Sequence, residues 1–152
     1  MTTFQLLTSS NIETIISMMQ DFYAIDNYPI DVAISKKLFK EFIADEKLGK
    51  AYLIYHSHGE RTTEVVGYAI LTYIFSFEYQ GRIAFLDELY IKESSRGKGI
   101  GKQTLDFIKE QALLLNVKLI YLELENHNEI AQKLYLANNF KVHNRKLLKL
   151  KL

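Results

Sequence analysis

Apolar positions along the chain follow two spacings, and these predict a protein that mixes helices and strands. Apolar residues recur every three or four positions over residues 12–19, 31–45, 100–115 and 129–137, which is typical of helices with one buried face. Shorter apolar or alternating runs predict strands at 3–8, 49–58, 64–77, 85–91, 117–124 and 141–152. The strand, helix and strand between 85 and 124 form a βαβ unit, so we expect these two strands to be parallel, with a right-handed crossover.

The helical spacing also predicts which side chains each helix buries. The first helix is expected to bury Ile12, Ile15, Ile16 and Met19. The second, capped by Asp31, is expected to bury Ala33, Leu38 and Phe42 together with Ile34. The helix at 129–137 is expected to bury Ile130, Ala131, Leu134, Tyr135 and Ala137.

Two strand segments have further features in the sequence. The strands at 49–58 and 64–77 flank a polar turn at 57–63, which predicts a hairpin. His56 and His58 lie two positions apart near this turn, but no further ligands are evident nearby, so we expect no metal site. In the C-terminal segment 141–152 lysine and leucine alternate, which is more typical of an edge strand protected by lysines than of a membrane or nucleic-acid surface.

Composition restricts the class of protein. A chain of 152 residues, 48% of them hydrophobic and 24% charged, is expected to fold as one soluble domain over residues 1–152. Its 19 basic and 18 acidic residues nearly balance, so no overall field favours nucleic acid. The absence of cysteine excludes disulfides and a cysteine nucleophile. With neither a signal-peptide pattern nor an apolar run near the roughly 18 residues of a membrane span, we expect a cytoplasmic protein that does not enter a membrane.

The segment from Phe85 to Lys102 carries the clearest chemical signal. An apolar strand with two acids leads into a glycine-rich, basic turn at the start of a helix. Such a turn can direct backbone amides at an anion, and glycine lets a phosphate approach the backbone. The glycines are Gly97, Gly99 and Gly101, and the neighbouring cations are Arg96, Lys98 and Lys102. The sequence therefore predicts a phosphate or pyrophosphate site.

Spacing narrows the identity of this site. A Walker loop fails, because Lys102 stands at its second glycine and Gln103 at its lysine. A dinucleotide-binding turn is a weak match, because Lys102 also replaces its third glycine. The pattern present is Arg-x-x-Gly-x-Gly at 96–101, after a strand ending in Leu-Tyr-Ile.

A second pattern lies about thirty residues further on, with Asn128, Ala131, Tyr135 and Phe140 in order and Asn139 where glycine is usual. The two patterns together closely resemble the GCN5-related N-acetyltransferase (GNAT) family. The resemblance implies an α/β (α+β) fold: a mixed, mostly antiparallel twisted sheet of about six to seven strands, about four flanking helices, and a parallel, splayed strand pair at the coenzyme site. It also allows a homodimer, since family members often pair.

The resemblance implies acetyl-CoA as cosubstrate. Its pantetheine would lie along residues 88–91 and pair with the backbone of Leu89 and Ile91, beside Tyr90. Its pyrophosphate would lie at Arg96, Gly97, Lys98, Gly99, Ile100, Gly101 and Lys102, with Asn128 and Ala131 also at the coenzyme. Tyr135 would be the general acid, because a phenol with a pKa near 10 can protonate a thiolate whose thiol has a pKa near 8.5.

Asp87 and Glu88 are the best candidates to deprotonate an amine. A primary amine has a pKa near 10.4, so it is charged at pH 7 and needs a carboxylate to attract it and a route for its proton. Polyamine acetyltransferases of this family resemble the segment in having an acidic pair at these positions. Neighbouring strand residues point to opposite faces unless a bulge intervenes, so only one is expected to face the cleft directly. The sequence does not choose between them.

The acidic, tyrosine-rich connection around residues 21–31 is a candidate substrate wall. We expect the acceptor to contact Tyr23, Asp26, Tyr28 and Glu78. Such a pocket suits a small cationic amine, polyamine-like or similar. A protein N-terminus or lysine as acceptor, and a non-catalytic acyl-CoA-binding module, remain the alternatives.

Overall fold

The computed structural model describes residues 1–57 and 62–152, so His58 and most of the predicted turn lie outside it. The strands are β1 (Thr2–Leu6), β2 (Gly49–Ser57), β3 (Thr63–Ser76), β4 (Gly81–Ile91) and β5 (Ile120–Tyr121). The helices are α1 (Ile12–Ile25), α2 (Val32–Ala44), α3 (Ile100–Leu114) and α4 (Glu129–Ala137), with short 3-10 turns at Ser9–Asn11 and Glu93–Ser95. Most predicted elements are confirmed, with shifted ends.

The strands form one sheet in the order β1-β2-β3-β4-β5. All neighbours are antiparallel except β4 and β5, which pair in parallel only at Ala84 with Ile120 and at Phe85 with Tyr121. Beyond Phe85, β4 continues for six residues to Ile91 without β5 beside it. The predicted mixed fold with a parallel, splayed strand pair is therefore confirmed.

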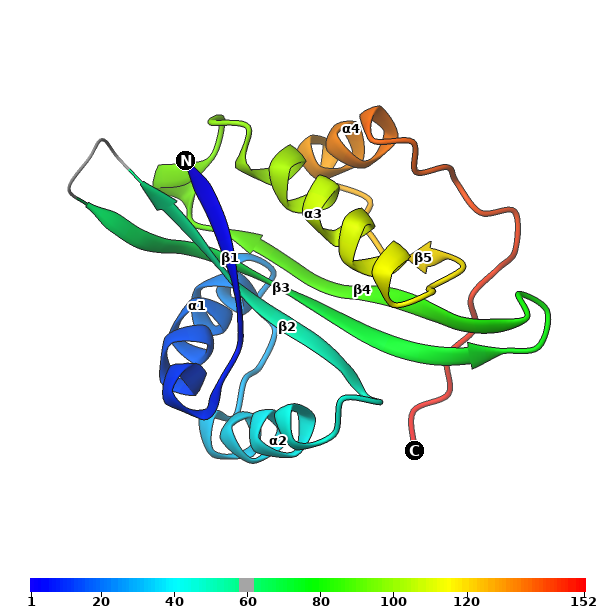
Figure 1. Ribbon diagram of the computed structural model, residues 1–152, viewed down its shortest axis with the longest axis horizontal. Coiled ribbons are helices and arrows are strands. Elements are labelled where there is room, and N and C mark those ends of the chain that lie inside the picture. The colour runs from blue at the N-terminus through cyan, green and yellow to red at the C-terminus, as the bar shows by residue number, and fades with distance from the viewer. Residues whose placement is uncertain (58–61) are drawn as a thin grey trace.

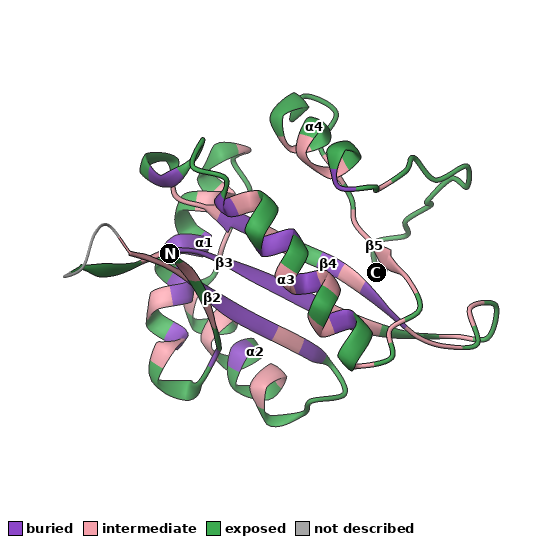
Figure 2. Ribbon diagram, turned by 45° about the horizontal axis from the view of Figure 1, so that its top comes forward, coloured by how far each residue is buried: buried purple, intermediate pink, exposed green. Residues whose placement is uncertain are grey.

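The helices cover the two faces of this sheet. Figure 1 shows α1 and α2 on one side of the strands and α3 and α4 on the other. Two main cores result: one packs α1 and Phe39 of α2 against β2, β3 and β4, and the other packs α3 against the opposite face. The buried residues run along the central strands between these layers (Figure 2). Burial of these apolar side chains is the main force that holds the helices on the sheet.

A bulge in β4 changes which face its side chains point to. Ile70 pairs with Glu88 but Leu71 pairs with Leu86, so Asp87 is an extra residue in β4. Before the bulge, Leu86 packs in the α3 core, whereas Tyr90 beyond it packs in the α1 core. These two residues are four positions apart, an even spacing that would keep them on one face of a regular strand. The bulge thus reverses the alternation of side chains, so that beyond it Tyr90 faces α1 while Leu89 faces α3.

The second helix buries a different face from the one predicted. Asp31 caps α2 as expected, accepting a hydrogen bond from the Ile34 amide at 2.9 Å. Phe39 is the buried residue and the predicted Phe42 packs partly buried against the same core, while Ile34 and Leu38 are each 56% exposed and Ala33 is also exposed. Apolar residues occupy most of the circumference of this helix, so the spacing could not fix which side meets the sheet. In α4, likewise, Ile130 is 82% exposed and Ala137 is exposed, contrary to prediction.

The strand predicted at 141–152 is wrong: these residues have neither helix nor strand and are exposed. The run predicted at 117–124 shrinks to the two residues of β5, so the described sheet has five strands rather than six or seven. A strand forms only where its backbone groups pair with a neighbour, and alternation of lysine and leucine cannot supply that neighbour. Instead, Arg145 holds the segment to Glu78 through two hydrogen bonds of 2.7 and 2.5 Å.

Candidate active site

The carboxylate of Glu88 is held by two phenols from other elements. The Tyr23 hydroxyl, on the last turns of α1, donates to Glu88 Oε1 at 2.6 Å. The Tyr68 hydroxyl, on β3, donates to Glu88 Oε2 at 2.7 Å. Each oxygen of the carboxylate therefore has one donor, and the side chain is fixed from two sides.

Burial raises the pKa of Glu88, and the hydrogen bonds from Tyr23 and Tyr68 act against this rise. Burial followed by the neighbouring Glu88 carboxylate raises the pKa of Tyr68, so its hydroxyl stays protonated and acts as a donor. Partial desolvation also raises the pKa of Asp87, although this residue is exposed. The pair thus combines a fixed carboxylate with a more accessible one.

Both acids line one cavity of about 320 Å³ between the sheet and α1 and α2. Its other lining residues are Met19, Tyr23, Ser35, Leu38, Phe39, Glu41, Phe42, Leu48, Ile70 and Thr72. We expected only one acid to face the cleft unless a bulge intervened. The bulge at Asp87 does intervene, and it turns both carboxylates toward the same space.

The connection after α1 reaches across to the segment before α4. The Tyr28 hydroxyl donates to Glu125, and the Asp26 carboxylate lies 2.9 Å from His127 Nε2. Tyr28 also contacts the ring of Tyr23 edge-on, with centroids 6.4 Å apart. Of the four predicted substrate residues, Tyr23 and Tyr28 therefore form one cluster with Glu88, whereas Asp26 contacts His127. Of these three, only Tyr23 lines the cavity of the acid pair. The fourth, Glu78, lies in the β3–β4 turn and binds Arg145, so the structure does not bring it to this cluster.

The glycine turn has the geometry predicted for an anion site. Gly97 and Gly99 have φ of 76° and 74°, a left-handed conformation that favours glycine. The first hydrogen bond of α3 runs from the Gln103 amide to the Gly99 carbonyl at 3.1 Å, so the amides of residues 100–102 have no acceptor within the helix. These free amides and the helix dipole favour a phosphate.

The cations around this turn differ in their surroundings. Arg96 Nε donates to the Ile91 carbonyl at 3.0 Å, which ties the turn to the end of β4. Lys102 Nζ lies 2.6 Å from Asp106, so part of its charge is neutralised, whereas Lys98 is exposed. Arg96 and Lys98 are therefore better placed than Lys102 to meet a phosphate.

Other residues of the two patterns set the position of α4. A Cβ on Gly101 would lie 2.9 Å from Leu134 Cδ2, so this glycine allows α3 and α4 to approach closely. The Asn128 side chain caps α4 by accepting a hydrogen bond from the Ala131 amide at 3.1 Å. Asn139 has φ of 69°, as expected of a residue that takes the place of glycine at a helix end.

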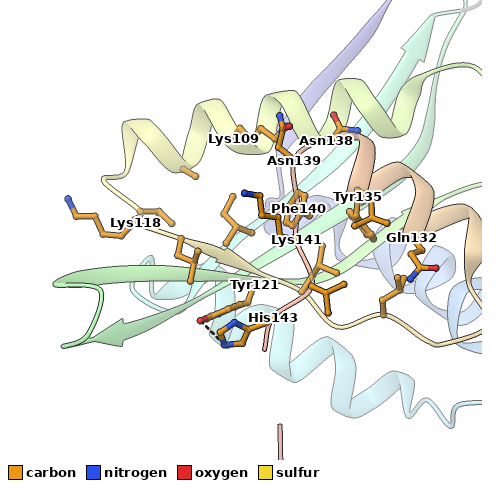
Figure 3. A pocket seen from close by; sticks show the side chains of 18 of the residues that line it. Lys109, Lys118, Tyr121, Gln132, Tyr135, Asn138, Asn139, Phe140, Lys141 and His143 are labelled. Carbon is orange, nitrogen blue, oxygen red and sulfur yellow. Dashed lines mark hydrogen bonds between the residues drawn. The ribbon is translucent and has the colours of Figure 1, made fainter. Parts of the chain in front are cut away.

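Tyr135 lines a second cavity, of about 900 Å³, between α3, β5, α4 and residues 140–143. Its ring packs edge-on against Phe140 at 5.5 Å, and burial raises its pKa to about 12. Figure 3 shows Tyr135 on α4 in this cavity, with Tyr121 and His143 on its other side. Tyr135 therefore lines a different cavity from the acid pair.

Sequence reasoning missed Tyr68, Glu41 and Ser35. A tyrosine in a strand is usually a packed core residue, and nothing in its spacing indicated a bond to Glu88. Among the described residues, no group of three or more His, Cys, Asp or Glu could hold a metal ion. In the same part of the chain, every helix is too short or too polar to cross a bilayer.

Solved structures with this architecture include acetyltransferases. An integron cassette protein from the Cole Harbour Salt Marsh metagenome matches with a TM-score of 0.84 and 26% identity, over 98% of this chain and 90% of that one. A predicted acetyltransferase from Clostridium acetobutylicum, solved with acetyl-CoA, matches with a TM-score of 0.77 and 18% identity, over 99% and 96% of the chains. The second likeness concerns the fold alone.

The model of the acetyltransferase (GNAT) family matches residues 15–140, and the chain belongs to this family. An uncharacterized N-acetyltransferase of Bacillus subtilis is 32% identical over 81 residues, and the thialysine N-epsilon-acetyltransferase of Bos taurus is 35% identical over 74. These matches cover 53% and 48% of this chain and 54% and 42% of the relatives. The chain thus matches about half the length of these curated relatives.

Proposed function

We propose that this protein is an acetyl-CoA-dependent N-acetyltransferase whose acceptor is the primary amine of a small cationic molecule. The observation that carries the proposal is the pair Asp87 and Glu88 lining one cavity, just past the point where β4 loses β5 as its neighbour. Two carboxylates in a cavity walled by aromatic and aliphatic groups attract a cation with an apolar body. The volume of about 320 Å³ suits a small molecule.

The residues of the glycine turn fit the diphosphate of coenzyme A. The free amides at the start of α3 lie next to the left-handed Gly97 and Gly99, and nothing lies within 4 Å of a Cβ built on Gly97, so an anion can approach the backbone there. The end of β4 leads from this turn to the acid pair. The backbone of Leu89 and Ile91, on the edge that β5 leaves, can pair with an extended ligand such as pantetheine.

In this proposal acetyl-CoA supplies the acetyl group, and the protein moves two protons. Asp87 or Glu88 attracts the ammonium form of the acceptor and accepts its proton, directly or through water. The amine nitrogen then forms a bond to the acyl carbon as the carbon–sulfur bond breaks. The Tyr135 hydroxyl, which its raised pKa keeps neutral before the step, protonates the departing sulfur. No cysteine is present to carry the acetyl group, so direct attack is the route.

The cavity favours small amines over a protein acceptor, and the name of the bovine relative also points to an amino-acid amine. An assay with acetyl-CoA and a panel of polyamines, amino-sugar amines, free basic amino acids and lysine peptides tests this. We expect the highest kcat/KM for small acceptors with a cationic amine. A clear preference for acidic or neutral acceptors, or for long peptides, would contradict the proposal, and no turnover at all would favour a binding module.

A further inference from the structure

We infer that Tyr23 and Tyr68 are positioning residues that fix the Glu88 carboxylate as the anchor for the acceptor's ammonium group, and leave Asp87 as the mobile carboxylate of the pair. This inference rests on the proposed function and assigns separate tasks within the same site. Tyr68, which the sequence did not suggest, becomes part of the site that holds the acceptor's cationic group.

The geometry restrains Glu88 more than a single hydrogen bond would. Tyr68 is completely buried and cannot leave its place without disturbing the α1 core. Its ring lies against Phe22 and Tyr90, with centroids 6.5 and 5.8 Å away. Tyr23 reaches the other carboxylate oxygen from α1. Because the two donors come from two different elements, rotation of the Glu88 carboxylate would break at least one bond.

The fixed carboxylate can still bind a cation. A carboxylate has about four lone-pair sites, and the two phenols use two of them. Glu88 also lines the cavity rather than being sealed in the core, so a ligand can reach the remaining sites. An anion that keeps its position and charge is suited to orient an ammonium group, since no reorganisation is needed on binding.

Asp87 has the complementary properties. No described residue donates a hydrogen bond to its carboxylate, and the residue is exposed at the same cavity. It can therefore move toward an amine proton or a water. The ionisable groups around Glu88 are Tyr23 from α1, Tyr68 from β3 and Asp87 from β4, and Glu41 from α2 lines the same cavity. None of these is a cation, so the acceptor itself would supply the positive charge that the cavity lacks.

Three phenol variants separate a positioning role from a structural one. Tyr68→Phe and Tyr23→Phe each remove one donor to Glu88. Tyr73→Phe is the matched control, because Tyr73 lies on the same strand as Tyr68 and its buried hydroxyl has no hydrogen-bond partner in the described chain. The measurements are binding of putrescine by calorimetry, kcat and KM for the best amine of the panel, and the pH profile of kcat/KM.

We expect Tyr68→Phe and Tyr23→Phe to weaken putrescine binding and raise the amine KM by about tenfold, the scale of one hydrogen bond to a charged group, with kcat changed much less. The acidic limb of the pH profile should move to higher pH, because Glu88 loses a donor that favours its anion. Tyr73→Phe should change none of these. In a Glu88→Gln background, Tyr68→Phe should have no further effect on KM.

Other outcomes overturn the inference. If either phenol variant lowers stability but leaves putrescine binding and the pH profile as in the parent, the hydrogen bonds are structural. If Tyr68→Phe does not fold, Tyr23→Phe decides alone. If the parent protein binds putrescine but acetylates no amine, the proposed function fails while the anchor stands. If the parent acetylates amines yet Glu88→Gln binds them equally well, the anchor fails while the proposed function stands.

Discussion

The Asp26 carboxylate lies 2.9 Å from His127 Nε2, although 101 positions separate them in the chain. With the hydrogen bond from Tyr28 to Glu125, this contact joins the connection after α1 to the segment before α4. The two contacts link elements from opposite faces of the sheet, beyond the end of β5. The acidic, tyrosine-rich wall predicted from the sequence is therefore tied to the other half of the molecule.

Removing this link should loosen the connection. We expect Tyr28→Phe combined with Asp26→Asn to speed amide hydrogen exchange across residues 26–31, while α1 and β4 exchange as before. Hydrogen exchange with mass spectrometry measures this. Lys36→Ala, which removes a surface ion pair with Glu13, is the control and should leave residues 26–31 unchanged. Equal exchange in the double variant and the parent would show that the contacts do not restrain the connection.

Tyr135→Phe should lower kcat by about 100-fold or more, because a general acid typically contributes at least that factor. KM for acetyl-CoA should change little, since the ring and its packing on Phe140 remain. Steady-state kinetics with the best amine measures both. Tyr121→Phe, which removes a hydroxyl from the same cavity, is the control and should keep the parent's kcat. An unchanged kcat in Tyr135→Phe would remove Tyr135 from the mechanism.

The stability of the fold should depend on the protonation of Glu88. Burial raises its pKa above the ordinary 4.5, so the folded state holds this proton more tightly than the unfolded state. The stability that protonated Glu88 gives to the folded state is therefore fully present below pH 4.5, and it is lost as the pH rises through the folded-state pKa of Glu88. In urea unfolding above pH 4.5, the free energy of unfolding should fall less with pH for Glu88→Gln than for the parent. Parallel pH curves for the two proteins would contradict the raised pKa.

Gly67 is needed for close contact between β3 and β4. A Cβ there would lie 2.2 Å from the Tyr90 carbonyl oxygen, which is backbone and cannot simply move aside. We expect Gly67→Ala to lower the free energy of unfolding by about 3 kcal/mol, the upper range for overpacking. The control, Gly97→Ala, has open space around the new Cβ and should lose only about 1–2 kcal/mol from its positive φ. Urea unfolding gives both values, and a smaller loss for Gly67→Ala than for Gly97→Ala would be the contrary result.

The sequence alone determined those features that depend on local chemistry. Arg96 to Gly101 predicted a glycine turn at a helix start, and left-handed φ at Gly97 and Gly99 agrees with it. Asp31 predicted the cap of α2, and Asn139 predicted a helix end. Each of these follows from the conformational preferences of one residue and its near neighbours, which a sequence displays directly.

Tertiary structure alone decided the features that depend on distant partners. The buried face of α2 and the absence of a strand at 141–152 depend on which backbone and side chains lie opposite, and no spacing along the chain supplies them. The acid pair shows this most clearly. The sequence placed Asp87 and Glu88 on opposite faces of the strand unless a bulge intervened, and the register shift against β3 at Leu71 shows that bulge, with both acids lining one cavity. Tyr68 and Tyr23 then hold Glu88 from 20 and 65 positions away, through contacts that only the folded chain can make.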